Sequence, residues 1–324
     1  MIKPLEMSLG LPMEVANKVI STTDKVWEIL LASRDGDLEH VKKLVNECPE
    51  LIYAQYNYTP PIHFAVREGH VELVNYLLHQ GAHDSNYKIY PFLDKLDVLA
   101  ADRGHQEIVE LLSDYAAHPA RQKYFGDNGK IFFNRTDLQL EFQKAVDQND
   151  LEYTGLILED HPEFALDETY FWGEGILLSA AKKNHRGMID LLMNYGAKVP
   201  DGLKWTQKYY FERLDAATYM MEKGMNPNTM SWHQVTILHD MAQKGDLAKA
   251  ELLLQYGAEI NAVEEEYQST PLGMAARWGH LEMVGYLLRQ GADPKHAGAE
   301  WATPLAWAEK KGHTAIAELL KNKT

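Results

Sequence analysis

Cysteine is almost absent from this chain, because Cys48 is the only one among 324 residues. A single thiol cannot form an internal disulfide or a thiolate metal cage, so the fold cannot depend on either. This cysteine usage is typical of a reducing interior, and we expect a cytoplasmic protein. Long apolar runs are also missing from the start of the chain, MIKPLEMSLGLPMEVANKVI, where we expect neither a signal peptide nor a membrane span.

Basic residues are scarce, with 32 Lys and Arg against 47 Asp and Glu and a formal net charge of −15. Binding to nucleic acid or to an anionic membrane needs clustered Lys and Arg, so we expect neither partner. The motifs G-x-x-x-x-G-K-[ST], G-x-G-x-x-G, G-x-S-x-G and H-E-x-x-H are absent as well. The sequence therefore gives no support for a nucleotide cofactor, a serine nucleophile or a zinc site, and we expect no cofactor and no metal.

What the sequence does contain is internal repetition. TPLGMAARWGHLEMVGYLLRQGA from Thr270 is similar to PPIHFAVREGHVELVNYLLHQGA from Pro60 and to TILHDMAQKGDLAKAELLLQYGA from Thr236. A glycine returns at regular intervals of 33 to 35 residues within each half of the chain, at Gly36, Gly69, Gly104, Gly245, Gly279 and Gly312. A fixed period of this length is the signature of a stacked-repeat architecture.

Each part of the repeated pattern has a physical role. Thr270-Pro271 caps and begins a first helix, because proline needs no N–H partner at the first helical position. Gly279 makes the turn between the two helices, and LEMVGYLL supplies the apolar i, i+3, i+4 face of the second helix. Gly291 then ends that helix. One such unit cannot bury its apolar face alone, so neighbouring units must stack.

These stretches resemble the ankyrin repeat, and the chain is similar to a bacterial-type ankyrin array. The resemblance covers about residues 25–324 and implies an all-α solenoid of about nine helix-turn-helix units. It also implies that His63 and His239 bridge to a neighbouring turn by hydrogen bonds. The histidines that would begin second helices have structural roles in the same pattern: His70, His105, His185, His280 and His313.

The repeats predict how the chain is organised. Within an irregular stretch, KYFGDNGKIFF places aromatic residues on both sides of Asn128-Gly129, which is a hairpin turn signal. We therefore expect a short β-hairpin near 121–135. The expected parts are an N-terminal helical cap at 1–24, repeats 1–3 at 25–118, a linker or hairpin insertion at 119–137, and repeats 4–9 at 138–324.

Candidate binding residues gather in the last repeats. In ankyrin arrays the first helices and the turn tips line the concave groove, and here those positions carry more aromatic and charged side chains than a scaffold needs. We expect these groups to face solvent, so that Arg277→Ala or Trp278→Ala would weaken binding at little cost in stability. The candidate residues are Trp232, Asp240, Glu265, Glu266, Tyr267, Arg277, Trp278, Trp301, Trp307 and Lys310.

Two classes of function remain open. The fold analogy favours a recognition module that binds a protein segment or peptide in the groove, and acidic tips with aromatic residues would suit a basic segment. The alternative is an enzyme or a binder of a sugar-like small molecule, with an acid–base pair in the groove. A closed pocket of converging carboxylates would favour the alternative, and an open apolar trough would favour the recognition module. The candidate catalytic residues are Asp240, Glu265, Glu266, His233 and Tyr267.

Overall fold

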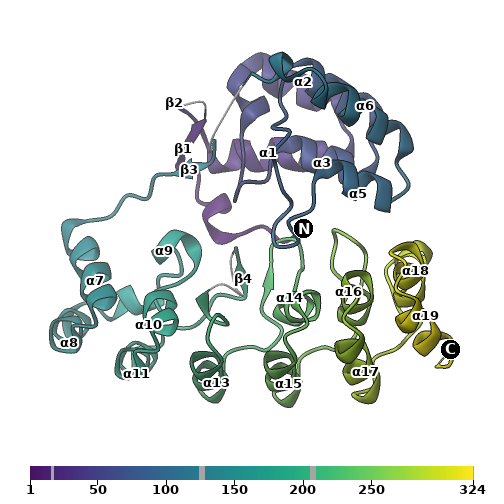
Figure 1. The fold of residues 1–324 in the computed structure, drawn as a ribbon. Coiled ribbons are helices and arrows are strands. Elements are labelled where there is room, and N and C mark those ends of the chain that lie inside the picture. Colours follow the sequence, from purple (N-terminus) through teal and green to yellow (C-terminus); the bar gives the residue numbers. More distant parts are fainter. Residues whose placement is uncertain (16–17, 124–127, 205–208, 324) are drawn as a thin grey trace. The chain divides into compact units, whose positions relative to one another are not determined.

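The computed structural model describes residues 1–15, 18–123, 128–204 and 209–323, which are mostly α-helical. The chain divides into two compact units. The first unit is Glu6–Asn134, and the second unit joins Met1–Leu5 to Arg135–Thr324. Each unit is a row of antiparallel helix pairs, which confirms the all-α repeat fold (Figure 1).

The first unit contains three helix pairs. Its first helices contact one another in sequence order, α1 to α3 and α3 to α5, and α4 contacts α6. Stacking of like helices on like helices is the solution that a repeat needs to bury its apolar face. The pairs are α1 Thr23–Asp35 with α2 Leu38–Glu47, α3 Pro61–Glu68 with α4 Val71–His79, and α5 Leu96–Asp102 with α6 Gln106–Ala116.

The second unit has the same design and forms a row of helix pairs of its own (Figure 1). Trp205, which precedes α13 Leu214–Glu222, lies outside the described residues. The structure therefore describes α13 as a second helix without the first helix of its pair. The pairs are α7 Asp137–Gln148 with α8 Leu151–Asp160, α10 Leu178–Lys183 with α11 Arg186–Asn194, α14 Ile237–Lys244 with α15 Leu247–Gln255, α16 Pro271–Trp278 with α17 Leu281–Arg289, and α18 Pro304–Lys310 with α19 Thr314–Lys321.

The sequence signals act locally as expected. The Thr270 hydroxyl accepts a hydrogen bond from the Gly273 N–H at 3.2 Å, and Pro271 occupies the first turn of α16. Gly279 ends α16 with φ of 81°, in the left-handed region where a side chain is strained. The buried face of α17 then carries Met283, Val284 and Leu287. Burying one such side chain contributes about 1.5–3 kcal/mol, so packing between repeats stabilises these short helices.

Histidines join several repeats to the one before them, which confirms the structural role of His70, His105, His280 and His313. His70 begins α4, and its ring Nε2 donates to the carbonyl of Arg34 at 2.8 Å. His105 reaches the carbonyl of Arg67 at 3.2 Å in the same way. In the second unit, His313 does so with the carbonyl of Arg277 at 3.1 Å. The histidine at each of these positions therefore satisfies a carbonyl at the end of the preceding first helix.

The buried histidine of α14 bridges as the resemblance implied. His239 Nε2 lies 3.0 Å from the carbonyl of Ala262 and 3.1 Å from that of Ser269. Its Nδ1 accepts from the backbone N–H of Thr236 at 3.2 Å. Burial lowers the pKa of His239 to about 4, so the ring is neutral at pH 7.

The prediction of a helical cap over residues 1–24 is wrong. After the short 3-10 helix η1 Leu5–Ser8, the chain forms two antiparallel strands, β1 Pro12–Val15 and β2 Lys18–Thr22. Met13 and Val15 are buried and Pro12 and Glu14 are not, which is the period-2 pattern of a half-buried strand. Val, Ile and Thr in KVIST are β-branched and favour an extended backbone over a helix.

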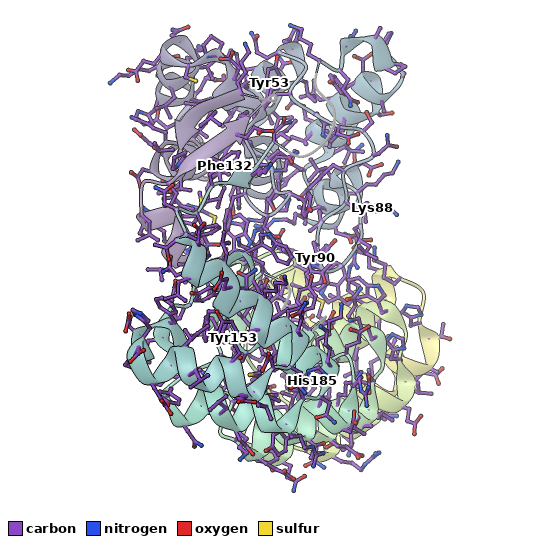
Figure 2. The ribbon with its side chains drawn as sticks, turned by 90° about the vertical axis from the view of Figure 1, so that its left-hand side faces the viewer. Tyr53, Lys88, Tyr90, Phe132, Tyr153 and His185 are labelled. Carbon is purple, nitrogen blue, oxygen red and sulfur yellow. The ribbon has the colours of Figure 1, made fainter. Side chains whose placement is uncertain are left out.

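The expected strand near 121–135 exists, but its described partner lies far away in the sequence. β3 Lys130–Ile131 pairs antiparallel with β1, so that Met13 lies opposite Ile131. Phe132 follows β3 (Figure 2), and its N–H donates to the carbonyl of Pro12 at 3.0 Å. The other arm of the predicted hairpin, 124–127, lies outside the described residues.

Short elements complete the two units. A second sheet of two parallel strands, β4 Gly202–Leu203 and β5 Met230–Ser231, lies in the second unit. The remaining helical turns are η2 Pro49–Tyr53, η3 Pro119–Arg121, η4 Pro162–Leu166, α9 Tyr170–Gly173 and η5 Glu300–Ala302.

No described helix combines the length and the apolar content that crossing a bilayer requires.

Candidate functional site

The acidic turn before α16 holds itself together. Glu264 is fully buried, and its carboxylate accepts the backbone N–H groups of Glu266 at 2.6 Å and of Ser269 at 3.0 Å. The N–H of Tyr267 points to the same carboxylate at 3.0 Å. Burial raises the pKa of Glu264 to about 8, and the neighbouring Glu266 adds to the shift. This glutamate therefore shapes the turn instead of presenting a charge to a partner.

The next two glutamates also have partners within the second unit. The Glu266 carboxylate forms a hydrogen bond with Nδ1 of His233, and both side chains are buried. The ring of Trp232 packs edge-on against the ring of His233 at 4.0 Å between centroids. Glu265 accepts from the amide of Gln234 and lies against the Met1 amino group. The turn tip is thus tied to the preceding tip through its carboxylates.

Arg277 is the centre of an aromatic cluster. Its guanidinium carbon lies 4.0 Å from the ring centroid of Tyr267, 4.0 Å from that of Trp278 and 5.2 Å from that of Trp307. Planar guanidinium groups stack favourably on aromatic faces, and more so where water is excluded. The Arg277 side chain is only 5% exposed. The structure therefore brings together residues from α16, from its preceding turn and from α18.

Trp307 is the most deeply buried ring of this cluster's indoles. It is fully buried, and its indole Nε1 donates to the hydroxyl of Ser269 at 2.6 Å. Trp301 meets its ring edge-on at 5.7 Å. The ammonium groups of Lys310 and Lys311 lie 5.7 and 5.8 Å from the same ring. Trp278, Trp301 and Lys311 are half-buried and Lys310 is exposed, so the cluster has a buried layer and a layer that reaches the surface.

We name the outer layer, Trp278, Trp301, Lys310 and Lys311, the indole surface. The prediction that the candidate residues face solvent is wrong for the members of the buried layer. The turn tips fold over the first helices, and side chains from both elements pack together there. Placement on a first helix therefore does not by itself determine exposure. The buried candidates are Trp232, His233, Asp240, Glu266, Tyr267, Arg277 and Trp307.

Asp240 stands apart from the aromatic cluster in its chemistry. It lies on α14 and is 1% exposed, and its Oδ2 accepts from Lys244 Nζ at 2.6 Å. Burial raises the pKa of Asp240, and Lys244 partly offsets that effect. Glu265 keeps 17% of its side-chain surface exposed. None of the candidate residues lines the cavity of about 180 Å³ beside Asp167 and Lys198.

One exposed indole was missed by the sequence analysis. Trp172 in α9 is 65% exposed, and both it and Phe171 have positive φ, at 64° and 50°. Its carbonyl accepts from Lys204 Nζ at 2.7 Å. The glycines at 173 and 175 could have indicated this exposed segment in the sequence. They mark an irregular backbone at the position where a repeat normally begins its first helix.

Stacked helix pairs joined by histidine-to-carbonyl hydrogen bonds define a helical repeat protein. The sequence matches the family model for ankyrin repeats, in three copies, over residues 29–123, 205–298 and 238–324. The chain belongs to the ankyrin repeat family.

Similar proteins have varied overall functions. The 2-5A-dependent ribonuclease of Mus musculus is 34% identical over 97 residues, which are 28% of this chain and 13% of the ribonuclease. Cyclin-dependent kinase inhibitor 2A of Monodelphis domestica is 31% identical over 120 residues, 37% of this chain and 70% of the inhibitor. ARF GTPase-activating protein GIT1 of Homo sapiens is 35% identical over 83 residues, 26% of this chain and 11% of that protein. The more specific bacterial-type assignment stays a prediction.

Proposed function

We propose that this chain is a protein-recognition module that binds a segment of a partner protein at the indole surface. Ankyrin repeats support a protein-binding role for the chain as a whole. The proposed position of the binding site rests on two half-buried indoles, Trp278 and Trp301. Behind them pack the buried side chains of Arg277 and Trp307. Tryptophan and arginine dominate binding energies in interfaces, and a rigid backing reduces the entropy lost on binding.

The charges around this surface favour an acidic segment. The sequence suggested a basic partner because of the glutamates at 264–266, but those carboxylates are engaged within the second unit. Lys310 and Lys311 instead place two cations near the ring of Trp307. In a chain of net charge −15, a local pair of lysines beside indoles is a distinct feature. An acidic segment with an aromatic or aliphatic anchor fits it best.

The relatives support a protein partner in general terms. One is by its name an inhibitor of a cyclin-dependent kinase, and another acts by its name on an ARF GTPase. Both names refer to protein targets. The catalytic alternative loses support because His233, Glu266 and Tyr267 are buried, while an acid–base pair must touch its substrate.

Selection from a display library of acidic, basic and neutral segments tests this proposal. We expect acidic segments to be enriched and Trp301→Ala to weaken their binding by about thirtyfold, the effect of a 2 kcal/mol hot spot. Trp172→Ala is the matched control, since Trp172 is an exposed indole of the same unit, and it should leave affinity unchanged. Enrichment of basic segments, or equal effects of the two variants, would contradict the proposed surface.

A further inference from the structure

A cavity of about 240 Å³ lies in the first unit, away from the residues discussed so far. Its walls come from the loop between α4 and α5, from the first turn of α5 and from one face of α6. Pockets for drug-sized ligands usually measure about 300–1,000 Å³. The cavity is smaller, so it suits a single small metabolite and is too small for an oligosaccharide.

His83 gives this cavity a buried polar group. The residue is 6% exposed, and its Nδ1 has no hydrogen-bond partner within the described part of the chain. The backbone around it is fixed, because the Tyr115 hydroxyl donates to the His83 carbonyl at 3.1 Å and the two rings lie 5.6 Å apart. Burial lowers the pKa of His83 to about 4, so at pH 7 the ring is neutral and one of its nitrogens can accept a hydrogen bond.

Two opposite charges line the same cavity. Lys95 and Asp97 lie at the start of α5, and both side chains are exposed. Neither forms an ion pair with any residue that the structure describes. Both are near enough to His83 to act on its protonation, Asp97 favouring the charged ring and Lys95 opposing it. An ammonium group beside Asp97 and a carboxylate beside Lys95 would therefore each meet an opposite charge.

The rest of the lining is part polar, from Ser85, Tyr87 and Ser113, and part apolar. Leu96 and Leu112 are buried at 1% and 4% exposure, and Val109 and Ala116 complete the lining on α6. An aliphatic side chain placed there would be removed from water, which is favourable in proportion to its buried area. The cavity thus combines a buried imidazole, two opposite charges and an apolar wall.

We infer that the first unit binds a free α-amino acid with an apolar side chain in this cavity. The α-ammonium donates to the Asp97 carboxylate, on the side of the cavity that the His83 ring lines. The α-carboxylate meets Lys95, and the side chain packs against Val109 and Leu112. This site is independent of the indole surface, which belongs to the second unit.

Calorimetric titration of the full chain with L-leucine at pH 7 tests this inference. Isocaproate lacks the ammonium group and isoamylamine lacks the carboxylate, so each should bind at least tenfold more weakly than leucine. Lys95→Gln and Asp97→Asn should each weaken leucine binding at least tenfold. Because both residues are exposed, these variants should fold. Val109→Trp should fill the cavity and abolish binding.

Matched controls come from the same elements. Lys88→Gln and Glu110→Gln neutralise exposed charges that do not line the cavity, and both should leave leucine affinity unchanged. Trp301→Ala should also leave it unchanged, which separates this site from the proposed protein-binding surface. The inference is overturned if leucine gives no binding heat, if isocaproate or isoamylamine binds as well as leucine, or if Lys95→Gln and Asp97→Asn retain full affinity.

Discussion

The imidazole ring of His280 covers Gly245, so that a Cβ atom added to the glycine would lie 2.8 Å from the ring. The ring Nε2 also donates to the carbonyl of Gln243 at 2.6 Å. Glycine at this position therefore serves two purposes, since it adopts φ of 68° and leaves room for the histidine of the next repeat.

Gly245→Ala should consequently destabilise the chain more than Gly257→Ala. Both glycines have positive φ, but a Cβ at Gly257 meets no atom within 4 Å. Left-handed strain costs about 1–2 kcal/mol in each variant, and overpacking against His280 should add about 1–3 kcal/mol at Gly245. Urea unfolding of the two variants measures the difference. Equal losses would mean that the histidine ring moves aside freely.

Arg277→Ala should lower the free energy of unfolding by about 2–5 kcal/mol, the range for a large side chain removed from a packed site. The buried guanidinium stacks on Tyr267 and Trp278, and alanine would leave a gap there. Arg289→Ala, on the exposed face of α17, should cost little. Denaturant titration compares them. A loss at Arg277 no larger than that at Arg289 would show that the cluster adds nothing to stability.

Trp307→Ala and Trp301→Ala should separate the two layers of the cluster. Trp307 is fully buried, so its removal should cost about 3–5 kcal/mol. Trp301 keeps part of its surface exposed and should cost clearly less. Thermal melting of the two variants at one protein concentration gives the comparison. If Trp301→Ala is the more damaging change, the division into a buried and a surface layer is incorrect.

Glu264 should make stability depend on pH. Its pKa in the folded chain is about 8, against an ordinary value of 4.5. Because the folded state holds this proton more tightly, the stabilisation is complete below about pH 4.5 and is lost as the pH rises through about 8. Glu264→Gln removes that titration but leaves a backbone N–H without its acceptor, which costs about 1–3 kcal/mol at pH 5.

The difference between the natural chain and Glu264→Gln should therefore shrink from pH 5 to pH 8. Unfolding free energies measured in denaturant at these two values suffice for the test. A difference that stays constant over this interval would exclude ionisation of Glu264 as the cause.

The sequence predicted those helices whose ends and buried faces are specified by residues close to them in the chain. The regular glycines at 245 and 279, the Thr-Pro starts and the apolar face of 281–288 specify the helix pairs without reference to distant residues. The structural role of His280 also followed from its place in the repeat.

Features that depend on distant residues were harder to predict. Exposure of Arg277 depends on how the turn carrying Tyr267 folds over its helix, and the chain there gives no periodic signal. Likewise, β3 pairs with β1 across more than a hundred residues. The cavity beside His83 joins three elements of one unit, and no single stretch of sequence describes it.

The pairing of β1 with β3 gives the first unit a property that an open row of repeats lacks. A linear repeat array can fray from either end, because each repeat contacts only its neighbours. Here the strand before repeat 1 is hydrogen-bonded to the strand after repeat 3. The connectivity of the first unit is therefore that of a ring closed by a small sheet. Opening it at either end removes the same strand pairing, so its two ends should exchange amide hydrogens together.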